Sequence, residues 1–331
     1  MHTLQEILER LPSTRVLVVG DIVLDHYIWG EVHRISPEAP IPVVQVVRET
    51  YTLGGAANVA HNLRTLDVAV HLCGVVGNDG HGRMLADLVC ERGIDGGAMV
   101  VDAGRPTTMK SRVIAHRQQV VRVDREITEQ LPDAVVSELK RRVAGLLPQI
   151  DAVIVEDYGK GVVNPALLAD VVERAREAGK IVTVDPKMDH LQHYRGITAI
   201  TPNRQEAESV LHTKIKDKDS LYRAGRRLLD LLGCRGVLIT LGEQGMCLFE
   251  DGVAPFEIPT QAREVYDVSG AGDTVIAVFT AALASGAAMR EAARLSNLAG
   301  GIVVEKLGTA TVTRQEIRAR LRELEAEGAM P

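Results

Sequence analysis

A glycine-rich run that ends in an aspartate is the part of the sequence best suited to chemistry. The run DVSGAGD, residues 267–273, follows a predicted strand at 263–266 and opens a long apolar helix. Gly270, Ala271 and Gly272 carry little side-chain bulk, so their backbone N–H groups can converge on one anion. The N-terminus of the helix adds positive potential at that point. The pattern predicts a site that stabilises the charge on a transferring phosphoryl group.

Asp273 stands where this helix begins. Its carboxylate could reach a substrate hydroxyl beside the anion site and accept its proton as a general base. A lone aspartate at this position could equally do no more than cap the helix. Other motifs along the chain have to decide between these two interpretations.

Several other reaction classes lack their sequence signals. No GxxxxGK[ST] phosphate loop occurs, and Gly20-Asp21-Ile22 stands where a dinucleotide-binding GxGxxG would follow the first strand. No HExxH and no paired Cys or His spacing indicates a metal centre of that type. A nicotinamide-dependent dehydrogenase is therefore a weak alternative.

Composition excludes some partners. The chain has 331 residues and a net charge of −6, which gives no overall field for nucleic acid or an anionic membrane. The four cysteines form no CxxC pair, which is typical of reduced thiols in a cytosolic protein. The N-terminus lacks the apolar stretch of a signal peptide, and no run of 18 apolar residues occurs. We therefore expect a cytoplasmic protein with no nucleic-acid or membrane partner.

Short β-branched runs alternate with helix-patterned segments along the chain. This alternation predicts an α/β fold with a parallel sheet buried on both faces, in one domain spanning 1–331. Ligands in such sheets bind beyond the carboxyl ends of the strands. The predicted strands lie at 16–19, 68–72, 152–155, 181–184, 199–200 and 237–240, and the predicted helices at 56–66, 82–92, 133–147, 164–178, 204–211 and 220–232.

Two segments break this rhythm. Residues 31–52 and 107–124 alternate apolar and polar side chains without an intervening helix, which indicates antiparallel strands. We expect them to form a small separate β-layer, a lid, although two edge strands of the main sheet would fit the same pattern. The valines at 43, 44, 46 and 47 would give the layer an apolar outer face, which predicts a homodimer joined through the lids.

Five motifs, in order along nearly the whole chain, resemble those of the ribokinase (pfkB) family of carbohydrate kinases. This resemblance implies a three-layer αβα sandwich with a β-sheet lid, and an ATP-dependent sugar or sugar-phosphate kinase that requires Mg²⁺. The motifs are Gly54-Gly55-Ala-Ala-Asn58, Gly77-Asn-Asp-Gly-His-Gly82, Thr201-Pro-Asn203-Arg-Gln-Glu206, Thr240-Leu-Gly242-Glu-Gln-Gly245 and the run 267–273.

The resemblance also assigns roles to residues. It implies that Asp273 is the catalytic base and that Asn203 and Glu206 organise Mg²⁺, although Glu206 could simply cap its helix. A monovalent cation such as K⁺ near residues 267, 269 and 308 is a family-level expectation. The residues expected at the nucleotide are Asn203, Thr240, Gly242, Gly245 and, more weakly because a structural role competes, Asn297.

Further segments, among them Asp157-Tyr-Gly-Lys-Gly161, resemble the branch of this family that acts on heptose 7-phosphate. A phosphorylated acceptor needs cations near it. Lys110, Arg112, Lys160 and Lys187 are the candidates for that role, whereas Asp21, Asp25, Asn58 and the Gly54-Gly55 backbone would bind sugar hydroxyls. Each has a plainer interpretation, as a solvated cation, a turn cap or a helix-start residue. Another sugar phosphate, a nucleoside, or a nucleotide-binding regulator without catalysis are the alternatives.

Overall fold

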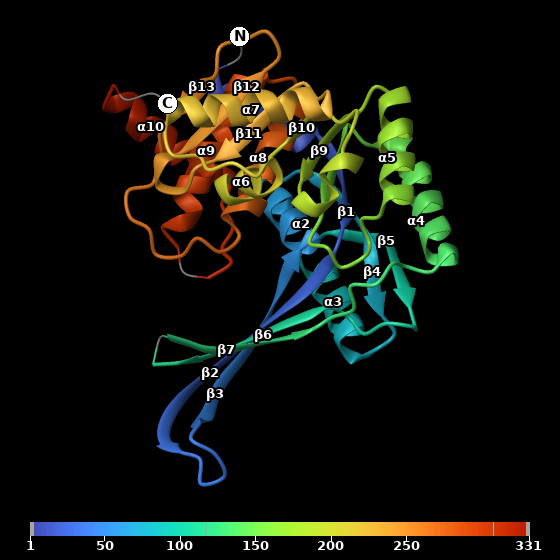
Figure 1. The fold of residues 1–331 in the computed structure, drawn as a ribbon, viewed down its shortest axis with the longest axis vertical. Helices are drawn as coiled ribbons and strands as arrows, with labels where there is room; N and C mark the ends of the chain where they lie inside the picture. Colours follow the sequence, from blue (N-terminus) through green and yellow to red (C-terminus); the bar gives the residue numbers. More distant parts are fainter. Residues whose placement is uncertain (1–2, 117, 307, 329–331) are drawn as a thin grey trace.

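A nine-stranded sheet forms the centre of the molecule, in a computed structural model that describes residues 3–116, 118–306 and 308–328 (Figure 1). The strand order is β13-β12-β11-β10-β9-β8-β1-β4-β5, and the strands from β11 through β5 pair in parallel. β12 and β13 pair antiparallel at one edge, so the sheet is mixed and not purely parallel as predicted. The strands of this sheet are β1 (Arg15–Gly20), β4 (Ala69–Gly77), β5 (Asp95–Asp102), β8 (Ala152–Glu156), β9 (Ile181–Asp185), β10 (Ala199–Ile200), β11 (Gly236–Thr240), β12 (Met246–Glu250) and β13 (Phe256–Ile258).

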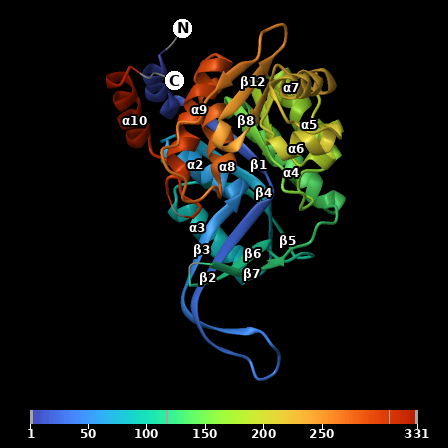
Figure 2. The same ribbon diagram turned by 60° about the vertical axis from the view of Figure 1, so that its left-hand side comes forward.

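Helices cover both faces of this sheet (Figure 2). On one face pack residues of α1, α2, α3, α8, α9 and α10, and on the other face residues of α4, α5, α6 and α7. The helices are α1 (Leu4–Arg10), α2 (Ala56–Thr65), α3 (Gly80–Glu91), α4 (Asp133–Leu146), α5 (Pro165–Glu177), α6 (Arg204–Leu211), α7 (Lys218–Leu232), α8 (Ala271–Ala284), α9 (Met289–Val304) and α10 (Arg314–Ala326), with short 3-10 turns η1 (Leu11–Ser13), η2 (Leu147–Gln149), η3 (Met188–His193) and η4 (Gly242–Gln244).

The alternation of side chains explains why the strands are apolar throughout. In β1, Val16 and Val18 join the apolar cluster under α2 and α8, while Leu17 and Val19 join the cluster under α4 and α5. Successive side chains of a strand point to opposite faces, so a strand covered on both faces needs apolar residues at every position. The predicted three-layer αβα sandwich is confirmed.

A second, four-stranded sheet projects from the body, with the strand order β3-β2-β6-β7 (Figure 1). β2 pairs antiparallel with β3 and parallel with β6, and β6 pairs antiparallel with β7. The sheet is larger than the two segments predicted for it, because β2 begins well before residue 31. Its strands are β2 (Ile22–Ile35), β3 (Pro42–Gly55), β6 (Met109–Ala115) and β7 (Gln118–Arg125).

The strand predicted at 263–266 is absent, and that prediction is wrong. The backbone N–H of Arg263 bonds the side chain of Glu305, and that of Tyr266 bonds the carbonyl of Val304. These bonds tie the segment to the end of α9 and not to a neighbouring strand. The run 267–273 therefore enters α8 from an irregular segment.

Candidate active site

Asp273 lies in the first turn of α8 and is 5% exposed. The side-chain amide of Asn58, in α2, donates to Oδ2 at 2.5 Å, and the hydroxyl of Tyr158 donates to Oδ1 at 3.3 Å. Burial raises the pKa of Asp273 to about 6, while the two hydrogen bonds act in the opposite direction. The carboxylate is thus ionised at neutral pH and can accept a proton.

The N-terminus of α8 has the geometry expected of an anion site. Gly270 caps the helix with φ 76°, a left-handed conformation that favours glycine. A Cβ at this residue would also lie 3.1 Å from Nδ2 of Asn58. Ala271 and Gly272 follow in the first turn, where backbone N–H groups have no partner inside a helix. The N–H of Ala271 bonds the carbonyl of Val268 at 3.3 Å, and the N-terminus of the helix brings positive potential next to Asp273.

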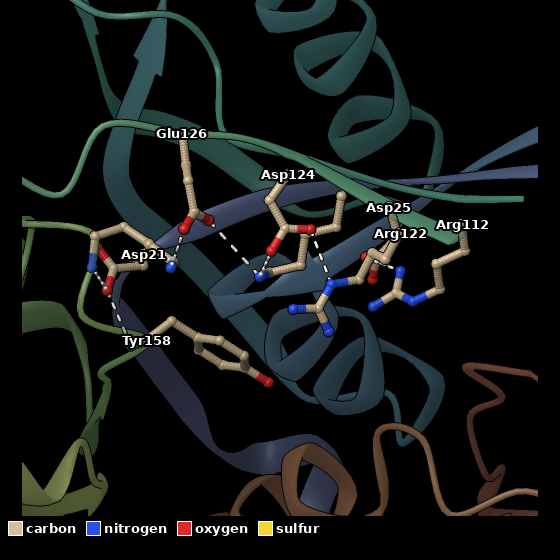
Figure 3. Close-up of polar contacts among 9 residues, drawn as sticks. Asp21, Asp25, Arg112, Arg122, Asp124, Glu126 and Tyr158 are labelled. Carbon is tan, nitrogen blue, oxygen red and sulfur yellow. Dashed lines mark hydrogen bonds and ion pairs between the residues drawn. The ribbon is translucent and has the colours of Figure 1, made fainter. Parts of the chain in front are cut away.

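Asp21 departs from its prediction as a ligand of sugar hydroxyls. Its carboxylate is 1% exposed and accepts hydrogen bonds from the backbone N–H groups of Tyr158, Lys160 and Val162, at 2.9, 3.0 and 3.1 Å. Burial raises its pKa to about 6. The carboxylate is committed to the loop after β8, and so it positions Tyr158 beneath the small sheet (Figure 3).

Asp25 and the glycine pair lie at the junction of the two sheets. The guanidinium of Arg112 bonds the carboxylate of Asp25. A Cβ on Gly54 would lie 2.5 Å from Oδ2 of Asp25, and Gly55 has φ 54° where β3 turns into α2. Both glycines therefore allow a close approach of backbone to side chain that other residues would block. The structure brings these four predicted residues together.

The predicted cations Lys110 and Lys160 already have carboxylate partners (Figure 3). Nζ of Lys160 lies 2.6 Å from Glu126, and Nζ of Lys110 lies 3.3 Å from Asp124 and 3.7 Å from Glu126. Arg122 also pairs with Asp124, at 2.9 Å. The sequence analysis did not anticipate these acidic partners, which offset much of the positive charge.

Lys187, the remaining predicted cation, lies against the loop after β8. The position of a Cβ on Gly159 would be 3.5 Å from its Cγ. Gly159 has φ 66°, and its N–H bonds Asp157 at 2.9 Å. Lys187 thus approaches the same loop that carries Tyr158 and Lys160.

A cluster of carboxylates that the sequence analysis did not assign could hold a metal ion. One oxygen each from Glu156, Asp185 and Asp273 lies within 4.8 Å of the others. Both carboxylate oxygens of Glu156 are buried without a hydrogen-bond partner. Burial, reinforced by neighbouring carboxylates, raises the pKa values of Glu156 and Asp185 well above their ordinary range. The unpartnered oxygens of Glu156, next to the carboxylates of Asp185 and Asp273, are hard donors of the kind that Mg²⁺ prefers.

The two residues predicted to organise Mg²⁺ bond each other at the start of α6. The side chain of Asn203 accepts from the N–H of Glu206 at 2.9 Å, and the side chain of Glu206 accepts from the N–H of Asn203 at 2.7 Å. This reciprocal arrangement is a capping box at the start of α6. The capping alternative for Glu206 is therefore present, and Glu206 also faces Asp185 closely enough to raise the pKa of that carboxyl group.

The loop predicted for the nucleotide follows β11, which ends at Thr240. Gly242 and Gly245 have φ values of 62° and 86°, and a Cβ on Gly245 would lie 2.1 Å from the carbonyl oxygen of Ile258. The glycines thus permit a tight turn. Asn297 is buried and donates to the carbonyl of Pro259 at 2.8 Å, the structural role that competed with nucleotide binding.

The region expected to bind a monovalent cation is organised around Asp267. Its two carboxylate oxygens accept from the N–H groups of Ser269 and Gly308, at 2.9 and 3.0 Å. Asp267 thereby connects the run before α8 to the segment after α9. The three residues named in the sequence analysis are adjacent in space.

Residues 13–316 match the family model described as "pfkB family carbohydrate kinase". The chain belongs to this family. Because members of the family are ATP-dependent sugar kinases, this pfkB-family chain is an enzyme of that class. No described helix of the kinase is long and apolar enough to cross a membrane.

Sequence relatives of this pfkB-family kinase include the "Bifunctional protein HldE" of Desulfatibacillum aliphaticivorans, 47% identical over 311 residues, and that of Geobacter sulfurreducens, 45% identical over 321 residues. The alignments cover 94% and 96% of this chain but only 64% of each relative. The chain therefore corresponds to one part of these longer proteins.

Solved structures share the fold at low sequence identity. Arabidopsis thaliana ribokinase complexed with ribose and ATP superposes with a TM-score of 0.74 at 21% identity, covering 93% of this chain and 98% of that one. Escherichia coli phosphofructokinase-2 in complex with potassium gives 0.78 at 18% identity, covering 94% and 99%. At these identities the comparisons show the fold alone.

Proposed function

We propose that this kinase transfers the γ-phosphoryl group of ATP to the anomeric hydroxyl of D-glycero-β-D-manno-heptose 7-phosphate. The product would be heptose 1,7-bisphosphate, for ADP-heptose and lipopolysaccharide core synthesis. The observation that carries this proposal is the 47% identity to an HldE protein across 94% of the chain. The buried carboxylate beside a helix N-terminus supplies the chemistry that phosphoryl transfer needs.

In this mechanism Asp273 is the general base. As the anomeric oxygen forms its bond to the γ-phosphorus, the hydroxyl proton passes to Asp273, and the bond from that phosphorus to the β-phosphate oxygen breaks. Asn58 and Tyr158 hold the carboxylate in place through their hydrogen bonds. N–H groups at residues 270–272 stabilise the charge on the transferred group.

Metal ions would be held by residues that have oxygens available. Glu156 and Asp185 are the candidates for direct contact with Mg²⁺, and Asn203 and Glu206 for contact through water. When bound, Mg²⁺ supplies positive charge against the triphosphate. A monovalent ion such as K⁺ would bind beside Asp267.

The acceptor would bind between the small sheet and the edge of the main sheet. Asp25, Asn58 and the Gly54-Gly55 backbone would bind the sugar hydroxyls, and their proximity to Asp273 and Arg112 supports this role. A nucleoside acceptor is less favoured, because aromatic residues make up 3% of the chain and the candidate pocket residues are polar. Turnover of ATP would distinguish a kinase from a nucleotide-binding regulator without catalysis.

The test is a coupled ADP-release assay on a panel of sugar phosphates, with mass spectrometry of the product. We expect the largest kcat/KM for the heptose 7-phosphate and a product that carries a second phosphate at the anomeric carbon. A different preferred sugar phosphate would reassign the acceptor within the family. No ADP release with any acceptor would favour the regulator.

A further inference from the structure

A small polar cavity of about 180 Å³ lies between α2, α3 and the segment that follows α9. No carboxylate is among the described residues that line it. We call it the Thr-Arg pocket, and its polar lining residues are Thr52, Asn58, His61, Arg92, Thr309 and Thr311. The absence of acidic groups among them distinguishes this cavity from the row of lysines and carboxylates at the small sheet.

The pocket carries a positive charge that its surroundings do not neutralise. Nη1 of Arg92 lies 3.3 Å from Nε2 of His61. Burial, assisted by the charge of Arg92, lowers the pKa of His61 to about 4, so at neutral pH the imidazole is an uncharged acceptor for Arg92. Within the described ranges of the chain, no carboxylate pairs with Arg92, which is an exposed residue at the rim of the pocket. An anion entering the pocket would therefore meet an uncompensated guanidinium.

A second observation indicates a missing partner. Oγ1 of Thr52 is buried and has no hydrogen-bond partner. Buried hydroxyl groups in folded proteins are generally bonded, and an unpaired one costs about 1–3 kcal/mol. Thr52 and Arg92 both line the cavity, and a phosphate oxygen accepts bonds from hydroxyl and guanidinium groups alike.

The pocket also adjoins the groups expected to bind the acceptor. Asn58 lines it and bonds Asp273. Thr52 faces Asp25 across the β2–β3 pair, and Cγ2 of Thr309 lies 3.9 Å from the position of a Cβ on Gly270. A group bound there would thus lie beside the sugar site.

The lysine row, which consists of Lys110 and Lys160 at the small sheet, is a less favourable binding site for a dianion. Glu126 contacts both Lys110 and Lys160, so a phosphate there would have to displace or face a carboxylate. We propose that the Thr-Arg pocket, and not the lysine row, binds the phosphate monoester of the acceptor. This inference rests on the proposed function, because it names the subsite for the phosphate that the proposed acceptor carries.

The main test compares Arg92→Gln, at the C-cap of α3, with Arg83→Gln, which removes a likewise exposed arginine that does not line the pocket. For heptose 7-phosphate we expect Arg92→Gln to raise KM about 10- to 150-fold, the range for a lost hydrogen bond to a charged group. The KM for ATP and the activity on unphosphorylated heptose should change less than about twofold. Arg92→Lys should restore part of the affinity. An unchanged KM for the sugar phosphate in Arg92→Gln would overturn the assignment.

A second variant separates ligand binding from folding. Thr52→Val removes the unpaired hydroxyl while keeping side-chain shape. Without ligand the variant should be at least as thermally stable as the wild type, because it loses an unsatisfied group. It should nevertheless bind the sugar phosphate more weakly. Loss of stability with unchanged binding would contradict the role given to Thr52.

Inorganic phosphate serves as the probe for direct binding, measured by calorimetry on the full chain. We expect binding that depends on Arg92 and competes with the sugar phosphate. Arg92-dependent binding without competition would place a separate anion site here and overturn the acceptor assignment. If the wild type does not phosphorylate heptose 7-phosphate but competition with another sugar phosphate remains, the proposed function fails while the pocket assignment stands.

Discussion

The side chains of Asn58 and Asp273 join the first turns of two helices that are 215 residues apart in sequence. The amide of Asn58 donates to Oδ2, which leaves Oδ1 to the hydroxyl of Tyr158. Both donors are neutral, so they orient the carboxylate without supplying a charge that would abolish its basicity. This relationship fixes the base relative to the N–H groups at the start of α8.

Asp273→Asn tests the base directly. Asparagine keeps the size and shape of the side chain but cannot accept the proton, so kcat should fall by about 10²–10⁴. ATP affinity should remain nearly unchanged, because the backbone N–H groups stay in place. The measurement is ADP release with equilibrium nucleotide binding. Near-normal turnover in a folded Asp273→Asn protein would exclude Asp273 as the base.

Tyr158→Phe tests the second donor to the base. The ring keeps its packing, but Oδ1 of Asp273 loses its hydrogen bond, and we expect kcat to fall about tenfold with little change in the KM for ATP. Tyr222→Phe is the matched control for kcat, since Tyr222 bonds Glu257 and not Asp273. Equal effects of the two substitutions on kcat would show that Tyr158 has no positioning role.

The alternation of apolar strands and amphipathic helices was sufficient to predict most of the fold, because strands buried on both faces are apolar at every position. The run 267–273 likewise identified Asp273. The pattern does not show which partner a polar side chain meets. Asp21 could be predicted near the site, but its three N–H bonds depend on the loop after β8 folding back over it.

The carboxylate cluster that could hold a metal ion could have been predicted from the sequence. Glu156 and Asp185 are acidic residues that end apolar parallel strands, where ligands bind. The pairing of Glu126 with Lys110 and Lys160 could not be predicted from the sequence. Glu126 follows β7, whereas Lys110 lies on β6 and Lys160 lies in the loop after β8. Side-chain partners across long sequence separations require the tertiary structure.

Protonation of two buried aspartates should act in opposite directions on stability and activity. Asp21 and Asp273 have pKa values raised from 3.8 to about 6 in the folded protein. A carboxyl group that binds its proton more tightly when folded adds stability below its unfolded pKa, and this is lost as pH rises through the folded pKa. Lowering the pH from about 7.5 to about 5 should therefore add stability through these two groups, while kcat falls as Asp273 gains a proton. His61, whose pKa is lowered to about 4, loses stability in the same window, so the contribution of a single aspartate is measured by comparing a variant with the wild type.

Calorimetry and ADP-release rates across this range measure the two responses. Asp79 and Asp95 have lowered pKa values, so the stability that they contribute is lost only below the window. Asp21→Asn removes one of these titrating carboxyl groups, so the melting temperature of the variant relative to the wild type should fall as the pH drops from about 7.5 to about 5. A difference between the two proteins that does not change with pH would contradict the raised pKa of Asp21.

Exposed apolar side chains on the small sheet predict how two copies of the chain associate. Val46 and Val47 are 50% and 70% exposed, and Val121 and Val123 on β7 are 48% and 55% exposed. These valines lie on the two outer strands of the small sheet, and exposed apolar side chains of this kind are typical of association sites. We expect a homodimer joined through the small sheets, and Val47→Asp should weaken it at least about tenfold, since burying an unpaired charge costs more than about 1.4 kcal/mol.

Val253→Asp, at a valine 45% exposed after β12, is the control and should leave the dimer intact. Light scattering and sedimentation at micromolar concentration decide the matter, and a monomeric wild type would refute the dimer.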